Sequence, residues 1–268
     1  MNSKIIFCVC DDKCKNKAKA MLDSFNKYND DFDSIVFTYG SFSVGEYECI
    51  NFAGDVVHIN VEIFDKCEIY RFFAAKDLLK KYDTVIYCDC DCLFFDKIPE
   101  FHGQIAMCEH FVDWENCKNL NRYIRSLSLI NIGFMVFNKT KDCIMDYICE
   151  MCMSKEDIIF EDKRNKRLIR LQPFMTIMSH FCNDFEIIKN YGINVAYWNL
   201  KSDNLSDERD IIKIGDKYFV NDENTPLIMF HFSGNRDNVF TRFNGSRPYE
   251  YYGKYIREIT NYWECLCK

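Results

Sequence analysis

Short apolar runs alternate with helix-patterned segments over about the first ninety residues, and this alternation constrains the fold more than any other feature of the chain. Runs of strand length, rich in β-branched and aromatic residues, lie at 4–10, 34–40, 56–64 and 84–89. Between them, apolar side chains recur at helical spacing at 18–28 and 69–82. The order strand, helix, strand, strand, helix, strand predicts an α/β domain with a largely parallel sheet.

The second part of the chain continues this pattern less regularly. Predicted strands lie at 104–111, 129–139, 195–200 and 226–234, a hairpin at 215–222, and helices at 144–153, 167–182 and 248–268. No repeat and no linker-like stretch interrupts the pattern. We therefore expect one domain over residues 1–245 and an aromatic, amphipathic helix within residues 246–268. We favour packing of this helix on the domain over contact with a membrane surface.

Charge and cysteine content limit the expected partners and compartment. The net charge of −7 gives no electrostatic reason to expect nucleic-acid binding. The first residues lack the pattern of a signal peptide, and no stretch has the apolar length of a membrane span. Many of the 16 cysteines lie inside apolar runs, where a reduced thiol behaves as a small hydrophobic side chain. We expect free thiols and a cytoplasmic protein, with peripheral membrane contact as the alternative.

Residues 84–96, TVIYCDCDCLFFD, place two carboxylates, Asp89 and Asp91, at the end of a predicted strand. In open α/β sheets, ligands bind beyond the carboxyl ends of the strands. Two acids among apolar neighbours need a compensating charge, which a divalent ion bound to a phosphate would supply. A solvated turn is the plain alternative, and the spacing alone does not decide between the two.

Two other interpretations of this segment remain open. An apolar strand followed by Asp-x-Asp also resembles the first motif of the haloacid dehalogenase phosphatases, with Asp89 as nucleophile. A cysteine-rich zinc-binding module is the second possibility. It would combine two sets of thiols, Cys8, Cys10 and Cys14 with Cys88, Cys90 and Cys92. In an extended chain the thiols of the second set share one face, opposite the aspartates.

Five segments together carry a more specific signal. They are KIIFCVCDDKC, YRFFAAKDLLKKYDTVIYCDCDCLFF, INIGFMVFN, NVAYWNL and PLIMFHFSG, in this order. By these motifs the chain resembles the GT-A-fold glycosyltransferases, in particular glycosyltransferase family eight and the bacterial and viral sugar transferases near it. The resemblance implies a mixed, mostly parallel sheet flanked by helices, with a C-terminal helical elaboration. It also implies transfer of a sugar from a nucleotide donor to a glycan or lipid-linked saccharide.

The resemblance assigns a metal site and a donor site. Asp89 and Asp91 match the family's DxD motif and His231 its third ligand, so they would hold Mn²⁺ or Mg²⁺ against the donor diphosphate. The donor, expected to be a UDP-hexose, would contact Cys10, Asp11, Asp12, Arg71, Asp89, Gly133, Gly234 and Arg236. For Asp11 and Asp12, capping of the following helix is the alternative.

Asn131 and Gln172 are the candidates for contact with the transferred sugar. Asn131 belongs to the Asn-x-Gly strand that lines the sugar site in the family, with a β-bulge at Gly133 as the structural alternative. Gln172 matches the amide of the family's Asp-Gln pair and would support a retaining transition state, but Leu171 stands where the acid is expected. The Lys that often follows HFSG is also absent. Its possible replacements are Arg236, Arg242 and Arg247.

Overall fold

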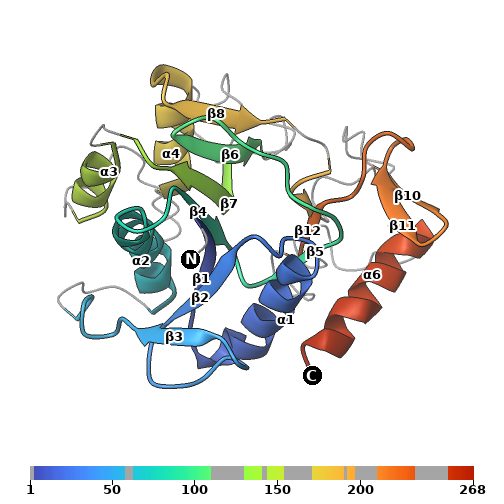
Figure 1. Cartoon of the computed structure of the whole chain (residues 1–268), viewed down its shortest axis with the longest axis horizontal. Coiled ribbons are helices and arrows are strands. Elements are labelled where there is room, and N and C mark those ends of the chain that lie inside the picture. The colour runs from blue at the N-terminus through green and yellow to red at the C-terminus, as the bar shows by residue number, and fades with distance from the viewer. Residues whose placement is uncertain are drawn as a thin grey trace, which may run out of the picture.

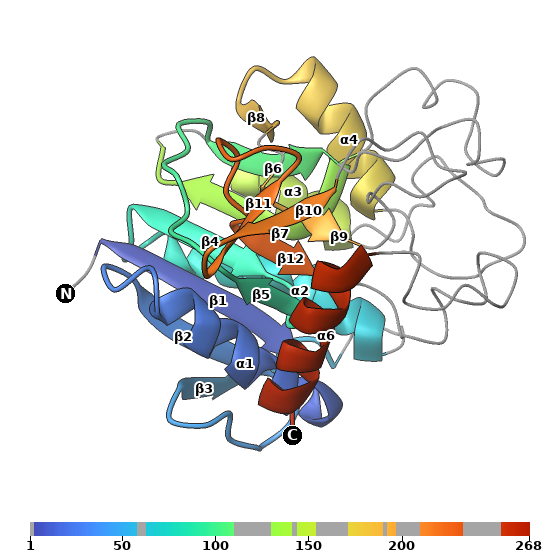
Figure 2. The ribbon, with the colours of Figure 1, turned by 90° about the vertical axis from the view of Figure 1, so that its right-hand side faces the viewer.

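The computed structural model of the chain is shown in Figure 1 and, turned by 90°, in Figure 2. It describes residues 3–57, 63–109, 130–140, 144–153, 171–189, 192–196, 210–232 and 253–268. A mixed β-sheet runs through the molecule with helices on both of its faces. This is the α/β architecture that the alternating pattern predicts.

The main sheet has seven strands in the order β3-β2-β1-β4-β7-β6-β8. Their bounds are Lys4–Cys10 (β1), Asp33–Thr38 (β2), Glu48–Asn51 (β3), Thr84–Cys88 (β4), Ile105–Glu109 (β6), Ile130–Asn138 (β7) and Phe185–Ile188 (β8). Neighbouring strands pair parallel, except that β7 lies antiparallel between β4 and β6. The sheet is therefore mostly parallel, with one reversed strand beside β4.

Strand β1 shows how the two faces of the sheet are covered. Its side chains alternate, so that Ile5 and Phe7 face one side and Ile6 and Cys8 face the other. The helices are α1 (Lys15–Asn26), α2 (Ile63–Leu78), α3 (Ile144–Met153) and α4 (Leu171–Phe181). Residues of α2, α3 and α4 complete the core on the first side, and residues of α1 complete it on the second. Both faces are buried, which explains why the strands read as continuous apolar runs.

A smaller sheet extends from the end of the main one. Its order is β5-β12-β9, with β5 at Cys92–Phe94, β12 at Met229–His231 and β9 at Val195–Ala196. A separate hairpin pairs β10 (Ile211–Ile214) with β11 (Lys217–Val220). The C-terminal helix α6 (Gly253–Leu266) packs against β10 and α1 (Figure 1). Its Trp263 ring stacks on Phe232 with the ring centroids 4.3 Å apart.

The third strand differs from the one predicted at residues 56–64. The structure places β3 at Glu48–Asn51, whereas Val56 and Val57 lie in a turn and Ile63 begins α2. β3 is the edge strand of the sheet and its side chains are mostly exposed. An exposed edge strand needs no apolar alternation, so its sequence carries little strand signal.

The described cysteines are all free thiols, 14 in number, and most of them are buried or half-buried. Several belong to the apolar cluster that α1 closes, where they pack as small hydrophobic side chains. In the part of the chain that the structure describes, no helix combines the length and the apolar character needed to cross a membrane.

Candidate metal and donor site

The two aspartates lie where the chain passes from one sheet to the other. Strand β4 ends at Cys88 in the main sheet, and β5 begins at Cys92 in the smaller sheet. Asp89 and Asp91 therefore occupy the turn between them, at the carboxyl end of β4. β5 pairs antiparallel with β12 so that Cys92 lies directly opposite His231. This register brings His231 to the aspartates from a distant part of the chain.

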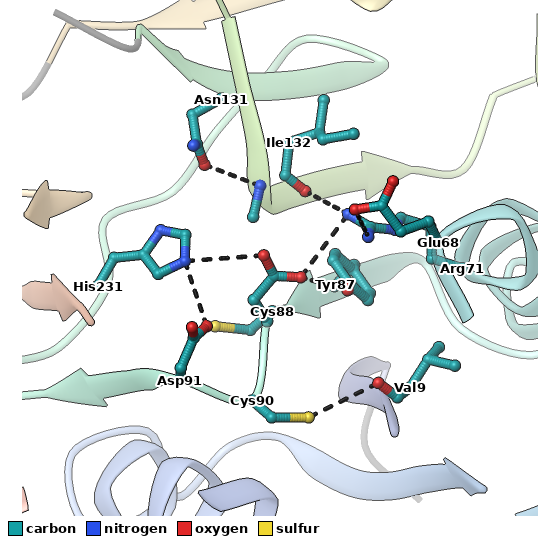
Figure 3. A network of polar contacts seen from close by, with 12 residues as sticks. Val9, Glu68, Arg71, Tyr87, Cys88, Cys90, Asp91, Asn131, Ile132 and His231 are labelled. Atoms are coloured by element: carbon teal, nitrogen blue, oxygen red, sulfur yellow. Dashed lines mark hydrogen bonds and ion pairs between the residues drawn. The ribbon is translucent and has the colours of Figure 1, made fainter. Parts of the chain in front are cut away.

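Nε2 of His231 faces the carboxylates of both aspartates, as the dashed lines in Figure 3 show. Its Nε2 is 3.3 Å from Asp91 Oδ1 and 3.7 Å from Asp89 Oδ2. The imidazole is 3% exposed, whereas the side chains of Asp89 and Asp91 are 30% and 26% exposed. The carboxylates are thus the accessible side of the cluster. The structure brings together the three residues that the DxD and HFSG motifs predict as metal ligands.

Asn194 fixes the orientation of His231 and was not among the residues predicted from the sequence. The other imidazole nitrogen, Nδ1, lies 2.9 Å from Asn194 Oδ1. An amide oxygen only accepts, so Nδ1 carries a hydrogen and Nε2 is the nitrogen directed at the carboxylates. Asn194 is fully buried and has a φ of 57°, a backbone conformation that Asn adopts more readily than most residues. The only sequence signal was an Asn before a short strand.

The charges of this cluster depend on one another. Burial pushes the pKa of His231 down, but the facing carboxylates of Asp91 and Asp89 raise it above the ordinary 6.5. Burial also opposes ionisation of Asp91, yet His231 and Lys17 hold the Asp91 pKa below the ordinary 3.8. Without a metal, the two carboxylates therefore favour the protonated imidazole. A divalent ion bound here would replace the proton on the imidazole.

Arg71 of α2 approaches Asp89 on the side away from His231, and only 3% of its side chain is exposed (Figure 3). Its Nη1 donates to the Ile132 carbonyl at 3.0 Å and lies 3.7 Å from Asp89 Oδ1, and its Nη2 lies 3.4 Å from Glu68 Oε1. The guanidinium carbon lies 4.4 Å from the centroid of the Tyr87 ring. The Tyr87 hydroxyl donates to Asp89 Oδ1. Two side chains therefore hold the Asp89 carboxylate in place.

Gly133 lets His231, Asp89 and Asn131 pack closely against β7. It lies in β7, within the stretch where pairing with β6 shifts register. Its carbonyl accepts from the Asp89 backbone N–H at 2.7 Å, and its own N–H donates to Asn131 Oδ1 at 2.8 Å. A Cβ on Gly133 would lie 2.5 Å from His231 Cε1, 2.8 Å from Asp89 Oδ2 and 2.9 Å from Asn131 Oδ1. Gly133 therefore lies at a β-bulge, as the structural alternative predicted, and also borders the aspartates and His231.

The predicted nucleotide-binding residues at the end of β1 lie beside the aspartates, because β1 is the parallel neighbour of β4. Cys10 is buried, and within the described ranges Asp11 Oδ1 is buried without a hydrogen-bond partner. Asp11 precedes the 3₁₀ turn at Asp12–Cys14 but makes no side-chain capping bond, so the capping alternative does not describe it. Asp12 is exposed, and its carboxylate pairs with Lys15 at 3.0 Å.

Several predicted residues cannot be placed beside the site. Gly234, Arg236, Arg242 and Arg247 lie outside the described residues. Gln172 belongs to the first turn of α4, and its side chain also lies outside the described part. Asn131, the other candidate for sugar contact, is 6% exposed and accepts the backbone bond from Gly133 described above.

The cysteines of this segment do not all point away from the aspartates. Cys90 Sγ donates to the Val9 carbonyl at 3.6 Å, on the side of the core that α1 covers. Cys92 differs, because one ligand atom each of Asp91, Cys92 and His231 lie within 4.8 Å of one another. Cys88, Cys90 and Cys92 do share one apolar cluster, as predicted, but Cys92 does not lie opposite both aspartates, because the chain turns at residues 90–91 instead of remaining extended. The predicted zinc set of six cysteines does not form such a group among the described residues.

Comparison with known proteins bears on the fold. No family model and no curated protein matches the chain. Among solved structures, the bifunctional glycosyltransferase WbbM matches with a TM-score of 0.54 and 12% identity, over 87% of this chain and 46% of that one. An active-site mutant of LgtC matches with a TM-score of 0.52 and 15% identity, over 92% and 98% of the two chains. The glycosyltransferase GlyE of Streptococcus pneumoniae TIGR4 matches with a TM-score of 0.51 and 9% identity, over 100% and 62%.

These similarities show a shared fold, and the predicted α/β fold of the glycosyltransferases is confirmed. The chain spans nearly the whole length of LgtC, about half of WbbM and less than two thirds of GlyE. A shared fold alone does not determine an activity, so the function has to be argued from the residues at the end of β4.

Proposed function

We propose that this chain is a metal-dependent glycosyltransferase that moves a hexose from a UDP-linked donor to a glycan or lipid-linked saccharide, with retention at the anomeric carbon. One observation carries the proposal: two carboxylates and an imidazole nitrogen converge at the carboxyl end of β4, in a domain with the fold of glycosyltransferases. Ligands bind at this end of the strands in open α/β sheets. Asp89, Asp91 and His231 are the proposed ligands of Mn²⁺ or Mg²⁺.

The residues fit a divalent ion by charge and by ligand type. Two carboxylates facing a nearly buried imidazole favour a positive charge between them, and they raise the pKa of His231 above its ordinary value. Carboxylate oxygens together with one imidazole nitrogen suit Mn²⁺. Gly133 has no side chain, which allows His231 and Asp89 to lie this close to β7. A bound ion would supply Lewis-acid stabilisation of the charge on the departing nucleoside diphosphate.

The residues around the ligands have supporting roles in this proposal. Arg71 and Tyr87 hold Asp89 in place, and Asn194 directs Nε2 of His231 toward the carboxylates. A residue that fixes a ligand in this way limits the reorganisation needed when the ion binds. Arg71 also brings a buried positive charge to the side of the site where we place the sugar and its phosphate.

The assignments on the donor side rest on the motifs. We assign Cys10, Asp11 and Asp12 to the nucleoside, with Asp11 the best placed of the three because its buried oxygen has no partner in the described part of the chain. Gly234 and Arg236 are assigned to the diphosphate. Asn131 and Gln172 are assigned to the transferred sugar, where Gln172 would support the retaining transition state. Because Leu171 stands where the family has an acid, retention at the anomeric carbon is proposed separately from sugar transfer.

A panel of nucleotide sugars tests the proposal. We expect one UDP-hexose to raise the melting temperature in the presence of Mn²⁺, and transfer or slow hydrolysis of that donor to stop in EDTA and resume with Mn²⁺. Asp91→Asn should abolish turnover with little change in melting temperature, because it removes a ligand charge while preserving shape. Asp216→Asn, in the exposed turn of the β10–β11 hairpin, is the matched control.

Two results would overturn the assignment. Full turnover in Asp91→Asn would contradict the metal site. Cleavage of simple phosphate esters, with a beryllofluoride adduct at Asp89 and no response to any nucleotide sugar, would instead support the phosphatase interpretation.

A further inference from the structure

Cys92 brings a thiol to this site, in addition to the carboxylates and the imidazole. It is the first residue of β5 and lies directly opposite His231 in the pairing with β12. Cross-strand neighbours of this kind have side chains on the same face of the sheet. Accordingly, Cys92 Sγ, an Asp91 carboxylate oxygen and a His231 ring nitrogen lie within 4.8 Å of one another.

The separation between the Asp91 and His231 ligand atoms suits a small tetrahedral ion. Bonds of 2.0–2.3 Å to zinc place neighbouring ligand atoms about 3.3–3.8 Å apart in a tetrahedron. The 3.3 Å separation of Asp91 Oδ1 and His231 Nε2 is of this size. Asn194 holds Nδ1 of the imidazole, so Nε2 is the nitrogen available to the ion. The exposed side of the carboxylates leaves room for a water molecule as the fourth ligand.

The site therefore contains two overlapping sets of ligands that share Asp91 and His231. The first set includes Asp89 and is rich in oxygen, as Mn²⁺ and Mg²⁺ prefer. The second set includes Cys92, and sulfur together with imidazole and one carboxylate favours Zn²⁺ or Cd²⁺. Asp89 is held by Tyr87 and Arg71 and is not needed for the second set.

We propose that Zn²⁺ or Cd²⁺ binds to Asp91, Cys92 and His231, and that such an ion excludes Mn²⁺ from the site. On binding, the S–H bond of Cys92 and the Nε2–H bond of a protonated His231 break, these protons pass to the buffer, and sulfur–metal and nitrogen–metal bonds form, so no oxidant is required. The ion enters past the carboxylates, which are the exposed side of the cluster. The metal-binding part of this inference uses geometry alone; the expectation that Zn²⁺ inhibits transfer rests on the proposed function.

Cobalt is the probe, because Co²⁺ bound to a thiolate gives a sulfur-to-metal charge-transfer band. The full-length protein, stripped with EDTA, is titrated with Co²⁺ and then with Zn²⁺ in competition. We compare the wild type with Cys92→Ala and with the matched control Cys90→Ala, which removes another buried thiol of the same turn, one that contacts Val9 instead. Melting curves establish that each variant is folded, and Cys92→Ser replaces Cys92→Ala if the alanine variant is not.

We expect the charge-transfer band in the wild type and in Cys90→Ala, and its loss in Cys92→Ala. Zn²⁺ affinity should fall by about tenfold or more in Cys92→Ala, because loss of a ligand should weaken binding at least as much as loss of a residue that only supports a ligand. Mn²⁺ affinity should change by less than about twofold, since that ion uses the oxygen-rich set. A band that survives Cys92→Ala, or that is absent from the wild type, would overturn the inference.

The same measurements separate this inference from the proposed function. If the cobalt band depends on Cys92 but no nucleotide sugar is turned over, the second ligand set is correct and the glycosyltransferase proposal fails. If transfer with Mn²⁺ proceeds and Zn²⁺ neither binds nor inhibits, the proposed function stands and the second ligand set is wrong.

Discussion

Gly133→Ala is a small change that tests whether the positions of His231 and Asp89 beside this glycine determine metal binding. The new methyl group would lie 2.5 Å from His231 Cε1 and 2.8 Å from Asp89 Oδ2, both shorter than normal contact distances. Overpacking of this size costs about 1–3 kcal/mol of stability. Alanine also reduces the conformational entropy of the unfolded chain relative to glycine, which offsets about 0.4–1 kcal/mol of this loss of stability. The variant should therefore fold with a modestly lower melting temperature.

The effect on metal binding should be much larger than the effect on folding. The two shortest of these contacts are to His231 and Asp89, so relief of the overlap must move these side chains. With Mn²⁺ at about 100 times its dissociation constant, the wild type gains roughly 2.7 kcal/mol of stability. A hundredfold weaker site would reduce that gain to about 0.4 kcal/mol at the same Mn²⁺ concentration.

The assay is thermal or urea denaturation of the EDTA-treated protein with and without Mn²⁺. Gly54→Ala is the matched control, because a Cβ on Gly54 would meet no atom within 4 Å and this glycine lies in a turn away from the aspartates. We expect Gly54→Ala to keep the full gain from Mn²⁺. An equal gain in Gly133→Ala would refute the reasoning, since it would show that the ion does not depend on the positions of His231 and Asp89 beside this glycine.

The remaining predictions concern the supporting residues, the charges and the last helix. In Asn194→Gly the backbone can keep its positive φ, but the oxygen that accepts from Nδ1 of His231 is lost. Mn²⁺ affinity, measured by calorimetry, should therefore fall by about 10- to 100-fold. An unchanged affinity would contradict the orienting role of Asn194. In metal-free protein, the raised pKa of His231 means that its charge stabilises the fold fully below pH 6.5 and progressively less as pH rises through the raised value. The stability difference between wild type and His231→Gln should accordingly narrow above pH 6.5 in EDTA, whereas a difference that grows with pH would show that the sign is wrong. Trp263→Ala should lower the free energy of unfolding by about 2–3 kcal/mol in urea denaturation, because the ring stack on Phe232 is lost. Tyr262→Ala, at a half-exposed position of the same helix, should lower it by less than about 0.5 kcal/mol. Equal effects of the two changes would show that α6 does not pack on the domain through Trp263.

Much of the main sheet could be predicted because its strands are buried on both faces. Such strands consist of apolar runs that a helix pattern separates, as in β1, α1 and β2. The exposed edge strand β3 has no such run and was placed wrongly at residues 56–64. The reversed direction of β7 also has no local signal, because the same apolar run suits a parallel or an antiparallel neighbour.

The aspartates could be identified as chemically important because two acids at the end of an apolar strand are costly without a partner. Motif resemblance added His231 and Arg71, and both lie beside the aspartates. Asn194 could not be identified in this way, since its role depends on a positive φ and on a contact with a residue in another strand. Such contacts depend on tertiary structure, and no spacing within one segment encodes them.

The sequence by itself determined the order of strands and helices over about the first ninety residues and the presence of two carboxylates at the end of β4. It did so because burial and backbone preferences act over a few residues, and their periodicity is visible along the chain. Only the tertiary structure decided which cysteine faces the site. The switch from the main sheet to the smaller one turns the chain at residues 89–91, and the register of β5 with β12 then places Cys92 opposite His231. A register between strands far apart in the chain is set by how the sheets assemble, and a shift of one residue would have turned that thiol to the opposite face.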